Sequence, residues 1–165
     1  AYAAGTDVPL LLVRADALPA ATIEALQRLA PSQSSMLVGD AAAINPETEQ
    51  AIRDLTDNPT ERLSHDTPAL TAARVAGFAI RDGATPRSLW LATSARFPDA
   101  LAASAAVGSS GGVLLLTDGS EEADATVLDF LSRYGPVAEA INLVGGTAAI
   151  PPGTESRVAG AVSLD

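Results

Sequence analysis

The chain has 165 residues, of which 47% are hydrophobic and 18% charged, so it is long enough for one ordinary domain or two small ones with a real core. Its net charge is −10 and all ten basic residues are arginine, which argues against a nucleic-acid partner and against attachment to anionic lipid. The absence of cysteine excludes disulfides, thiolate catalysis and cysteine-ligated zinc, and no apolar run reaches the roughly 20 residues that a membrane-spanning helix needs.

Apolar runs and helical spacings alternate along the chain. The first part predicts the end of a helix at Ala1–Thr6, a buried strand at Val8–Val13, a helix from Leu18 to Leu29 that Pro31 ends, a strand at Ser35–Val38, and a helix from Pro46 with Asn45 as its N-cap. The second part predicts a helix at Thr67–Ile80, a strand at Leu89–Ala92, a helix from Phe97 to Val107, a strand at Val113–Leu116, a helix at Thr126–Tyr134, a strand at Ala140–Val144 and a last helix after Ile150. Between them, the polar stretch Leu55–Arg62 is interpreted as a linker because of its Asn-Pro turn signal.

The segment Ser88–Val107 is the most distinctive of these units. It predicts a buried strand, a short polar loop and a helix. The ring of Pro98 presets φ in the first turn of this helix, and the positive end of the helix dipole stabilises the negative charge of Asp99 there. The body of this helix consists almost entirely of small residues, so another backbone layer could approach it closely.

An internal repeat relates the two parts of the chain. Pro9–Leu12 falls on Val113–Leu116 at a shift of 104 residues, and Leu37–Asp40 falls on Leu143–Gly146 at a shift of 106. The repeat is about 105 residues long and occurs once in full over 62–165 and once as its second half over 1–55, with 56–61 as the linker. Because repeats are usually several units long, we expect the chain to be part of something larger or to complete its first unit by association.

Alternating strands and helices with short connections predict parallel strands and right-handed crossovers. The expected fold class is therefore α/β, with layered parallel-sheet modules of the Rossmann-like or flavodoxin-like kind.

Open α/β sheets bind ligands in the crevice at the carboxyl ends of their strands, and this is where we expect a binding surface. The residues predicted to line it are Thr93, Ser94, Arg96, Thr117, Asp118, Gly145, Gly146 and Thr147. An arginine just before a helix N-terminus suits an anionic group, although Arg96 could instead pair with Asp99 or another surface acid.

Catalytic and cofactor chemistry has few residues to draw on. His65 is the single histidine and lies between Ser64 and Asp66, but no nucleophile-elbow pattern occurs, so we expect no enzyme and keep a His65 hydrolase as a weak alternative. The acidic stretch Asp118–Glu122 lacks EF-hand spacing and is expected to be a solvated loop, not a metal site. Gly145–Thr147 lacks the dinucleotide and P-loop spacings and is interpreted as a tight turn, so no cofactor is expected.

Three segments in order resemble the type 2 cell wall binding repeat (CWB2). They are Phe97–Ala103 after a Leu-Ala-Thr strand, Leu114–Asp118, and the Leu-Val-Gly-Gly of 143–146; Arg62-Leu63 fits the opening of the repeat. The chain departs from the family's pattern at Ser64–Pro68, where a Gly-x-Asp-Arg-Tyr motif is common, and it holds one and a half repeats where three are usual.

The resemblance implies a non-catalytic module of Gram-positive exported proteins that binds an anionic or glycan cell-wall polymer and anchors or supports an attached protein. We expect an extracytoplasmic location, in the cell wall or secreted, and an actinobacterial source. The alternative is a protein-interaction module that recruits or regulates a cell-wall hydrolase, with self-association through the half repeat. The net charge of −10 favours this alternative, because it opposes binding to an anion.

Overall fold

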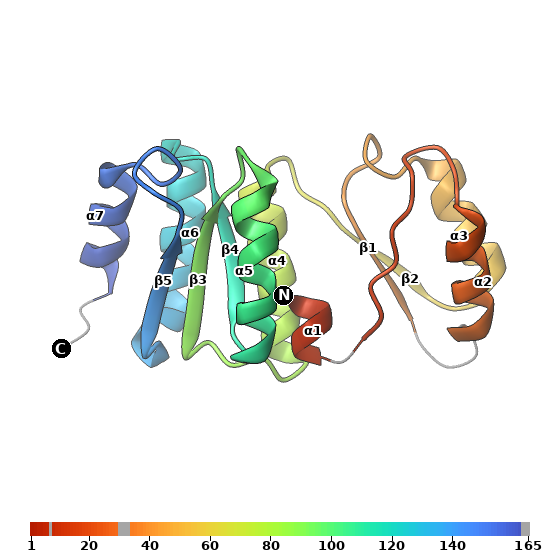
Figure 1. Cartoon of the computed structure of the whole chain (residues 1–165), viewed down its shortest axis with the longest axis horizontal. Helices are drawn as coiled ribbons and strands as arrows, with labels where there is room; N and C mark the ends of the chain where they lie inside the picture. Colours follow the sequence, from red (N-terminus) through yellow and green to blue (C-terminus); the bar gives the residue numbers. More distant parts are fainter. Residues whose placement is uncertain (7, 30–33, 163–165) are drawn as a thin grey trace. The chain divides into compact units, whose positions relative to one another are not determined.

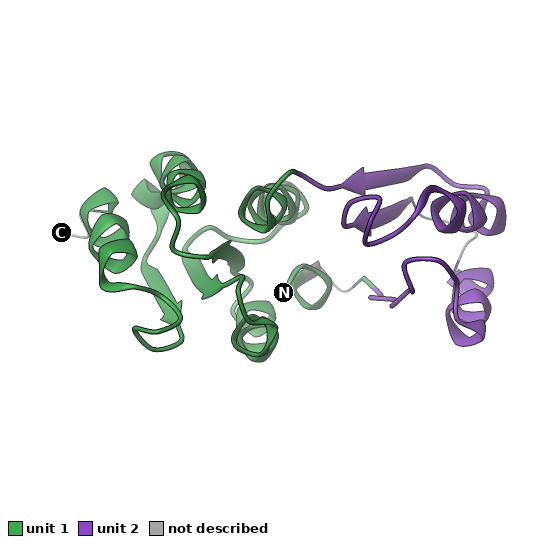
Figure 2. Ribbon diagram, turned by 90° about the horizontal axis from the view of Figure 1, so that it is seen from above, with its two compact units in different colours: residues 1–8, 66–165 green, residues 9–65 purple. Residues whose placement is uncertain are grey.

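The computed structural model describes residues 1–6, 8–29 and 34–162, and the chain divides into two compact units (Figure 1, Figure 2). Unit 1 comprises residues 1–8 and 66–165, and unit 2 comprises residues 9–65. The two units are defined by how compactly their residues pack together, and their limits are not those of the sequence repeat. The repeat boundaries at residues 55 and 62 stay a prediction. The helix end expected at Pro31 lies outside the described residues.

Unit 1 is a layered α/β structure around a parallel sheet with the strand order β4-β3-β5. Its elements are α1 (Tyr2–Thr6), α4 (Pro68–Arg81), β3 (Ser88–Thr93), α5 (Phe97–Ser109), β4 (Val113–Thr117), α6 (Glu121–Tyr134), the 3-10 turn η1 (Gly135–Val137), β5 (Ala140–Val144) and α7 (Pro152–Ala161). Helix α5 covers one face of the sheet, and α4 and α6 cover the other (Figure 1, Figure 2). The predicted fold class is confirmed.

The core of unit 1 lies between the sheet and these helices. Its most deeply buried large apolar side chains come from both layers and are Leu89, Leu91, Val107, Val113, Leu115, Val127 and Leu131. Burying a side chain of this size stabilises the fold by roughly 1.5–3 kcal/mol. The small residues of α5 serve close packing, as predicted: a Cβ on Gly108 would lie 2.5 Å from the Cβ of Ala4 in α1.

Unit 2 contains α2 (Ala20–Leu29), β1 (Ser35–Val38), α3 (Pro46–Thr56) and β2 (Thr60–Leu63), with β1 and β2 paired in parallel. Leu37, Ile44 and Ile52 form its buried cluster. Polar N-caps begin helices in both units, because Asn45, Thr67 and Ser120 each accept a hydrogen bond from the backbone N–H three residues on.

One predicted strand is wrong. The segment Val8–Val13 is not a buried strand but an irregular stretch in which Leu10 and Leu12 are 75% and 76% exposed. Its counterpart β4 is buried because β3 pairs with it, whereas no described segment pairs with residues 8–13. The polar stretch Leu55–Arg62 includes the end of α3 and three residues of β2, and its role as the linker between the two repeats stays a prediction.

Candidate functional site

The predicted binding residues at the end of β3 and those at the end of β4 lie side by side, because the carboxyl ends of these two strands are neighbours in the sheet. Thr93 and Thr117 are direct neighbours in the parallel register and are both buried. The N–H of Ser94 donates to the carbonyl of Thr117 at 2.8 Å, which extends the pairing one residue past β3. The backbone pairing of β3 and β4 therefore continues to the carboxyl ends of both strands.

Arg96 lies at this edge immediately before α5. It occupies the N-cap position with an extended backbone and makes no side-chain cap hydrogen bond. Its side chain is exposed, and within the described residues it forms no hydrogen bond or ion pair, with Asp99 or with any other group. A guanidinium next to a helix N-terminus combines a full positive charge with the partial charge of unpaired backbone N–H groups.

The turn after β5 adjoins the same helix end. Gly145 has φ of +120°, and the Oδ2 atom of Asp99 would lie 3.2 Å from a Cβ placed on it, so the first turn of α5 lies against this turn. Gly145, Gly146 and Thr147 are all exposed. Asp118, also exposed, accepts hydrogen bonds from Ser120, which hold the pKa of its carboxyl below the ordinary value.

A buried carboxylate behind this edge was not predicted from the sequence. Asp124 is 2% exposed and accepts hydrogen bonds from the hydroxyls of Thr117 and Thr154, both at 2.8 Å, and from Arg157 Nε at 2.9 Å. Burial acts to raise the pKa of Asp124, but the bonds from Arg157, Thr117 and Thr154 outweigh it and hold that pKa below its ordinary value. Thr117 also accepts from the N–H of Gly119 at 3.0 Å, so the network fixes the loop after β4.

An exposed apolar pair lies beside Arg96 and was also missed. Phe97 is 75% exposed and Leu101 is 66% exposed, one helical turn apart on α5. Single exposed apolar residues are common on protein surfaces, whereas neighbouring ones often mark a contact surface. The exposed pair beside Arg96 therefore indicates a candidate contact surface at the start of α5. The signal was present in the sequence: these are the two large side chains in the first half of a helix otherwise made of small residues.

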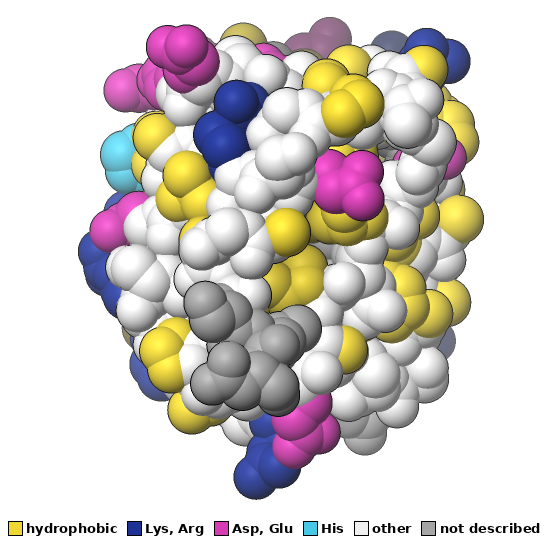
Figure 3. Space-filling view, turned by 90° about the vertical axis from the view of Figure 1, so that its left-hand side faces the viewer, with side chains coloured by type: hydrophobic (Ala, Val, Ile, Leu, Met, Phe, Trp, Pro, Cys, Tyr) yellow, Lys and Arg dark blue, Asp and Glu magenta, His cyan; other side chains and the backbone are white. Residues whose placement is uncertain are grey.

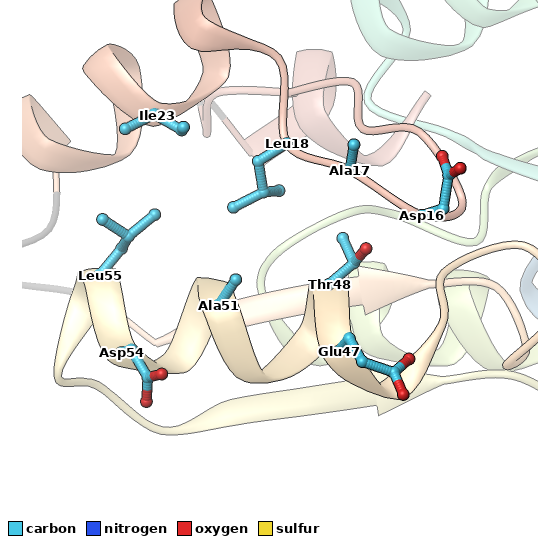
Figure 4. A pocket seen from close by; sticks show the side chains of 9 residues that line it. All are labelled: Asp16, Ala17, Leu18, Ile23, Glu47, Thr48, Ala51, Asp54 and Leu55. Carbon is cyan, nitrogen blue, oxygen red and sulfur yellow. The ribbon is translucent and has the colours of Figure 1, made fainter.

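In Figure 3, arginine and acidic side chains are interspersed with apolar ones on the visible face and do not gather into one patch. Unit 2 has a groove of about 480 Å³ between α2 and α3, lined by Leu18, Ile23, Ala51 and Leu55 among others. Figure 4 shows the apolar side chains facing each other across it, whereas Asp54 and Glu47 point away.

Within the described part of the chain, no three acidic or histidine side chains gather into a possible metal site. None of the described helices has both the length and the apolar character needed to cross a membrane. His65 lies exposed in the segment between β2 and α4.

The sequence profile of the family "Cell wall binding domain 2 (CWB2)" matches residues 62–155, more than half of the chain. The chain belongs to this family, which confirms the predicted resemblance. The family is one of cell wall binding modules and is not a catalytic family, and its occurrence in cell wall proteins supports an extracytoplasmic location.

Two solved structures share the fold. Cwp6 from Clostridium difficile superimposes with a TM-score of 0.84 at 21% identity, over 97% of this chain and 24% of that one. Cwp8 from Clostridium difficile gives a TM-score of 0.79 at 21% identity, over 96% of this chain and 26% of that one. The chain thus spans about a quarter of the length of each. A search of the curated proteins gave no match.

Proposed function

We propose that the chain is a non-catalytic cell-envelope module that binds an anionic or glycan polymer of the cell wall at the carboxyl edge of the unit 1 sheet. In this way it anchors or supports an exported protein. The observation that carries the proposal is Arg96: an exposed arginine at the N-terminus of α5 that is paired with no described residue, in a chain that belongs to a cell wall binding family.

The chemistry of the edge suits such a polymer. The guanidinium of Arg96 and the first N–H groups of α5 offer donors to a phosphate or carboxylate, and the exposed turn Gly145–Thr147 offers backbone groups beside them. Phe97 adds an exposed aromatic ring next to the charge, which provides apolar contact area for a sugar ring. The Asp124 network holds the loop after β4 in place.

The test compares Arg96→Ala with Arg74→Ala in sedimentation with isolated cell walls. Arg74 is the matched control because it is also an exposed arginine of unit 1, but it lies on α4, on the opposite face of the sheet. A lost charge-assisted hydrogen bond costs about 1.5–3 kcal/mol, so we expect Arg96→Ala to weaken retention by about tenfold or more. The melting temperature should not change. Equal retention of the two variants would remove Arg96 from the site.

A second function is favoured by the net charge of −10, which opposes binding to an anionic polymer. In this alternative the chain is a protein-interaction module that recruits or regulates a cell-wall hydrolase. Crosslinking at the cell envelope, followed by identification of the attached protein, tests it: a crosslinked hydrolase supports the alternative, and crosslinks to wall polymer alone contradict it.

A further inference from the structure

Unit 2 shows how the outer edge of a strand of this repeat is covered. Strand β2 runs parallel to β1, with Ser35 opposite Thr60 and Val38 opposite Leu63. The N–H of Ser35 donates to the carbonyl of Pro59 at 2.9 Å, and the N–H of Gly39 donates to the carbonyl of Leu63 at 3.0 Å. The backbone N–H groups on this side of β1 therefore find hydrogen-bond acceptors in β2 from one end of the strand to the other.

One side chain of β2 fastens the turn that follows β1. Arg62 donates from Nη1 to the carbonyls of Gly39 at 2.6 Å and Asp40 at 2.9 Å, and from Nη2 to the carbonyl of Ile44 at 2.8 Å. It also binds the carboxylate of Glu49 in α3 through Nε and Nη2, at 3.0 and 2.6 Å. The side chain is only 19% exposed, so Arg62 acts as an internal clamp between β2, the turn and α3.

Unit 1 repeats this acceptor set at the shift of 106 residues. Gly39, Asp40, Ile44 and Glu49 correspond to Gly145, Gly146, Ile150 and Glu155. The two turns have the same geometry: φ is +135° at Gly39 and +120° at Gly145, and a Cβ on either glycine would crowd the alanine four residues on.

The edge of unit 1 that corresponds to the covered edge of β1 is the outer side of β5, and no strand among the described residues pairs with it. Strand β5 pairs with β3 on one side only and ends the sheet (Figure 1). The N–H of Ala140 points toward β3, where it donates to Arg87, so alternation along the strand directs the amides of Ile141, Leu143 and Gly145 to the open side. Within the described residues, no arginine pairs with Glu155, which is exposed where Glu49 is half-buried.

We infer that the open edge of β5 is a docking site for a strand of another type 2 cell wall binding repeat. The strand adds in parallel, in the register that Thr60–Leu63 adopts on β1, and its arginine clamps the carbonyls of Gly145, Gly146 and Ile150 to Glu155. Charge and sequence pattern define the docking strand. It needs a cationic side chain that can bind one carboxylate and three carbonyls, and the strand that carries such a side chain in unit 2 has the sequence Thr-Glu-Arg-Leu. This surface makes a protein contact that does not use Arg96, although it shares the turn at Gly145 and Gly146 with the proposed polymer site.

The repeat itself supplies the probe. The shift of 106 residues places Asp165 on Pro59, so residues 60–66 can be appended after Asp165 with the spacing they have in unit 2. A matched control carries the same extension with its arginine replaced by alanine. Tethering keeps the added strand at high local concentration, so a weak intrinsic affinity does not hide the contact.

Hydrogen exchange of the β5 amides is the main measurement. If the added strand pairs in nine of ten molecules, exchange at Leu143 and Gly145 slows about tenfold, and the melting temperature of unit 1 rises. The alanine extension should lose most of this protection. Glu155→Gln should also reduce it, whereas Glu121→Gln, an exposed acid in the first turn of α6, should not.

Two results would overturn the inference. Unchanged exchange at β5 with the arginine extension would mean that the edge does not accept this strand. Equal protection by the arginine and alanine extensions would mean that the edge accepts strands without the arginine clamp, and the assigned role of Glu155 would then be wrong.

Discussion

The two units contain the same half repeat but bury it differently. In unit 1 the run Val113–Thr117 is a strand with three fully buried residues, because β3 pairs with it and α4 covers it. In unit 2 the corresponding run leaves Leu10 and Leu12 exposed and forms no ladder. The difference shows that an apolar run becomes a strand when a partner strand is available, and that its own sequence is not sufficient.

The polar groups behind the sheet differ in the same way. In unit 1, Thr154 donates to the buried carboxylate of Asp124, which Arg157 also binds. In unit 2, the equivalent Thr48 donates to the carbonyl of Ala15 at 3.2 Å, and the position of Arg157 is taken by Ala51 in the lining of the groove. Unit 2 depends instead on Arg62, whose side chain is 19% exposed, whereas Arg157 of unit 1 is 43% exposed; the two arginines therefore hold polar groups at different places in the two units.

Leu115→Ala should give the largest effect. The side chain is 2% exposed in the middle of strand β4, and truncating such a leucine costs about 2–5 kcal/mol through lost burial and the cavity left behind. Denaturant unfolding followed by the fluorescence of Trp90, on the neighbouring strand β3, measures it. A loss below about 1 kcal/mol would contradict the position assigned to β4.

Arg62→Ala should come next and should act on unit 2. The substitution leaves the carbonyls of Gly39, Asp40 and Ile44 without this donor and Glu49 with Arg53 alone, at a cost of about 1.5–3 kcal/mol. Arg62→Lys should not restore stability, because an ammonium group cannot span these acceptors as the guanidinium does. Hydrogen exchange should quicken over residues 35–63, and full rescue by lysine would argue against the clamp.

Asp124→Asn should lower the stability of unit 1 by about 1–3 kcal/mol at pH 7, since three donors lose a carboxylate. The folded-state pKa of Asp124 lies below its ordinary value of about 3.9, so its stabilisation is present above that pH and is lost as pH falls through the folded pKa. Thermal melts from pH 7 to pH 2 should therefore fall more steeply below about pH 4 in the wild type than in the variant. Parallel curves would exclude this role.

Leu12→Ala should give the smallest effect, within about 0.5 kcal/mol, because the side chain is 76% exposed. It is the direct comparison with Leu116→Ala, the same position of the repeat in a paired strand. The same denaturant series measures both, and a loss above about 1 kcal/mol at Leu12 would show that the segment is buried in solution.

The sequence predicted the elements whose signals are local. The cap at Asn45, the helix that starts at Thr67-Pro68, the strand at Ala140–Val144 and the small-residue helix α5 all appear as expected, because capping and periodicity act within a few residues. Features that depend on distant partners were missed: the exposure of Leu10, the pairing of β2 and the burial of Asp124 against Arg157, which is 33 residues away.

The candidate site divides along the same line. Parallel topology predicts that residues at strand ends, such as Thr93 and Thr117, lie close together, and the structure places these two side by side. Whether Arg96 would pair with Asp99 could not be read from spacing, because the backbone at the N-cap and the turn at Gly145 decide where both side chains lie.

The most direct test of the proposed function is a pull-down of the purified chain on isolated cell walls before and after chemical removal of their anionic polymers. We predict retention on intact walls and its loss on the stripped walls. Equal retention on both preparations would contradict binding to an anionic polymer, and no retention on intact walls would contradict wall binding and favour a protein partner.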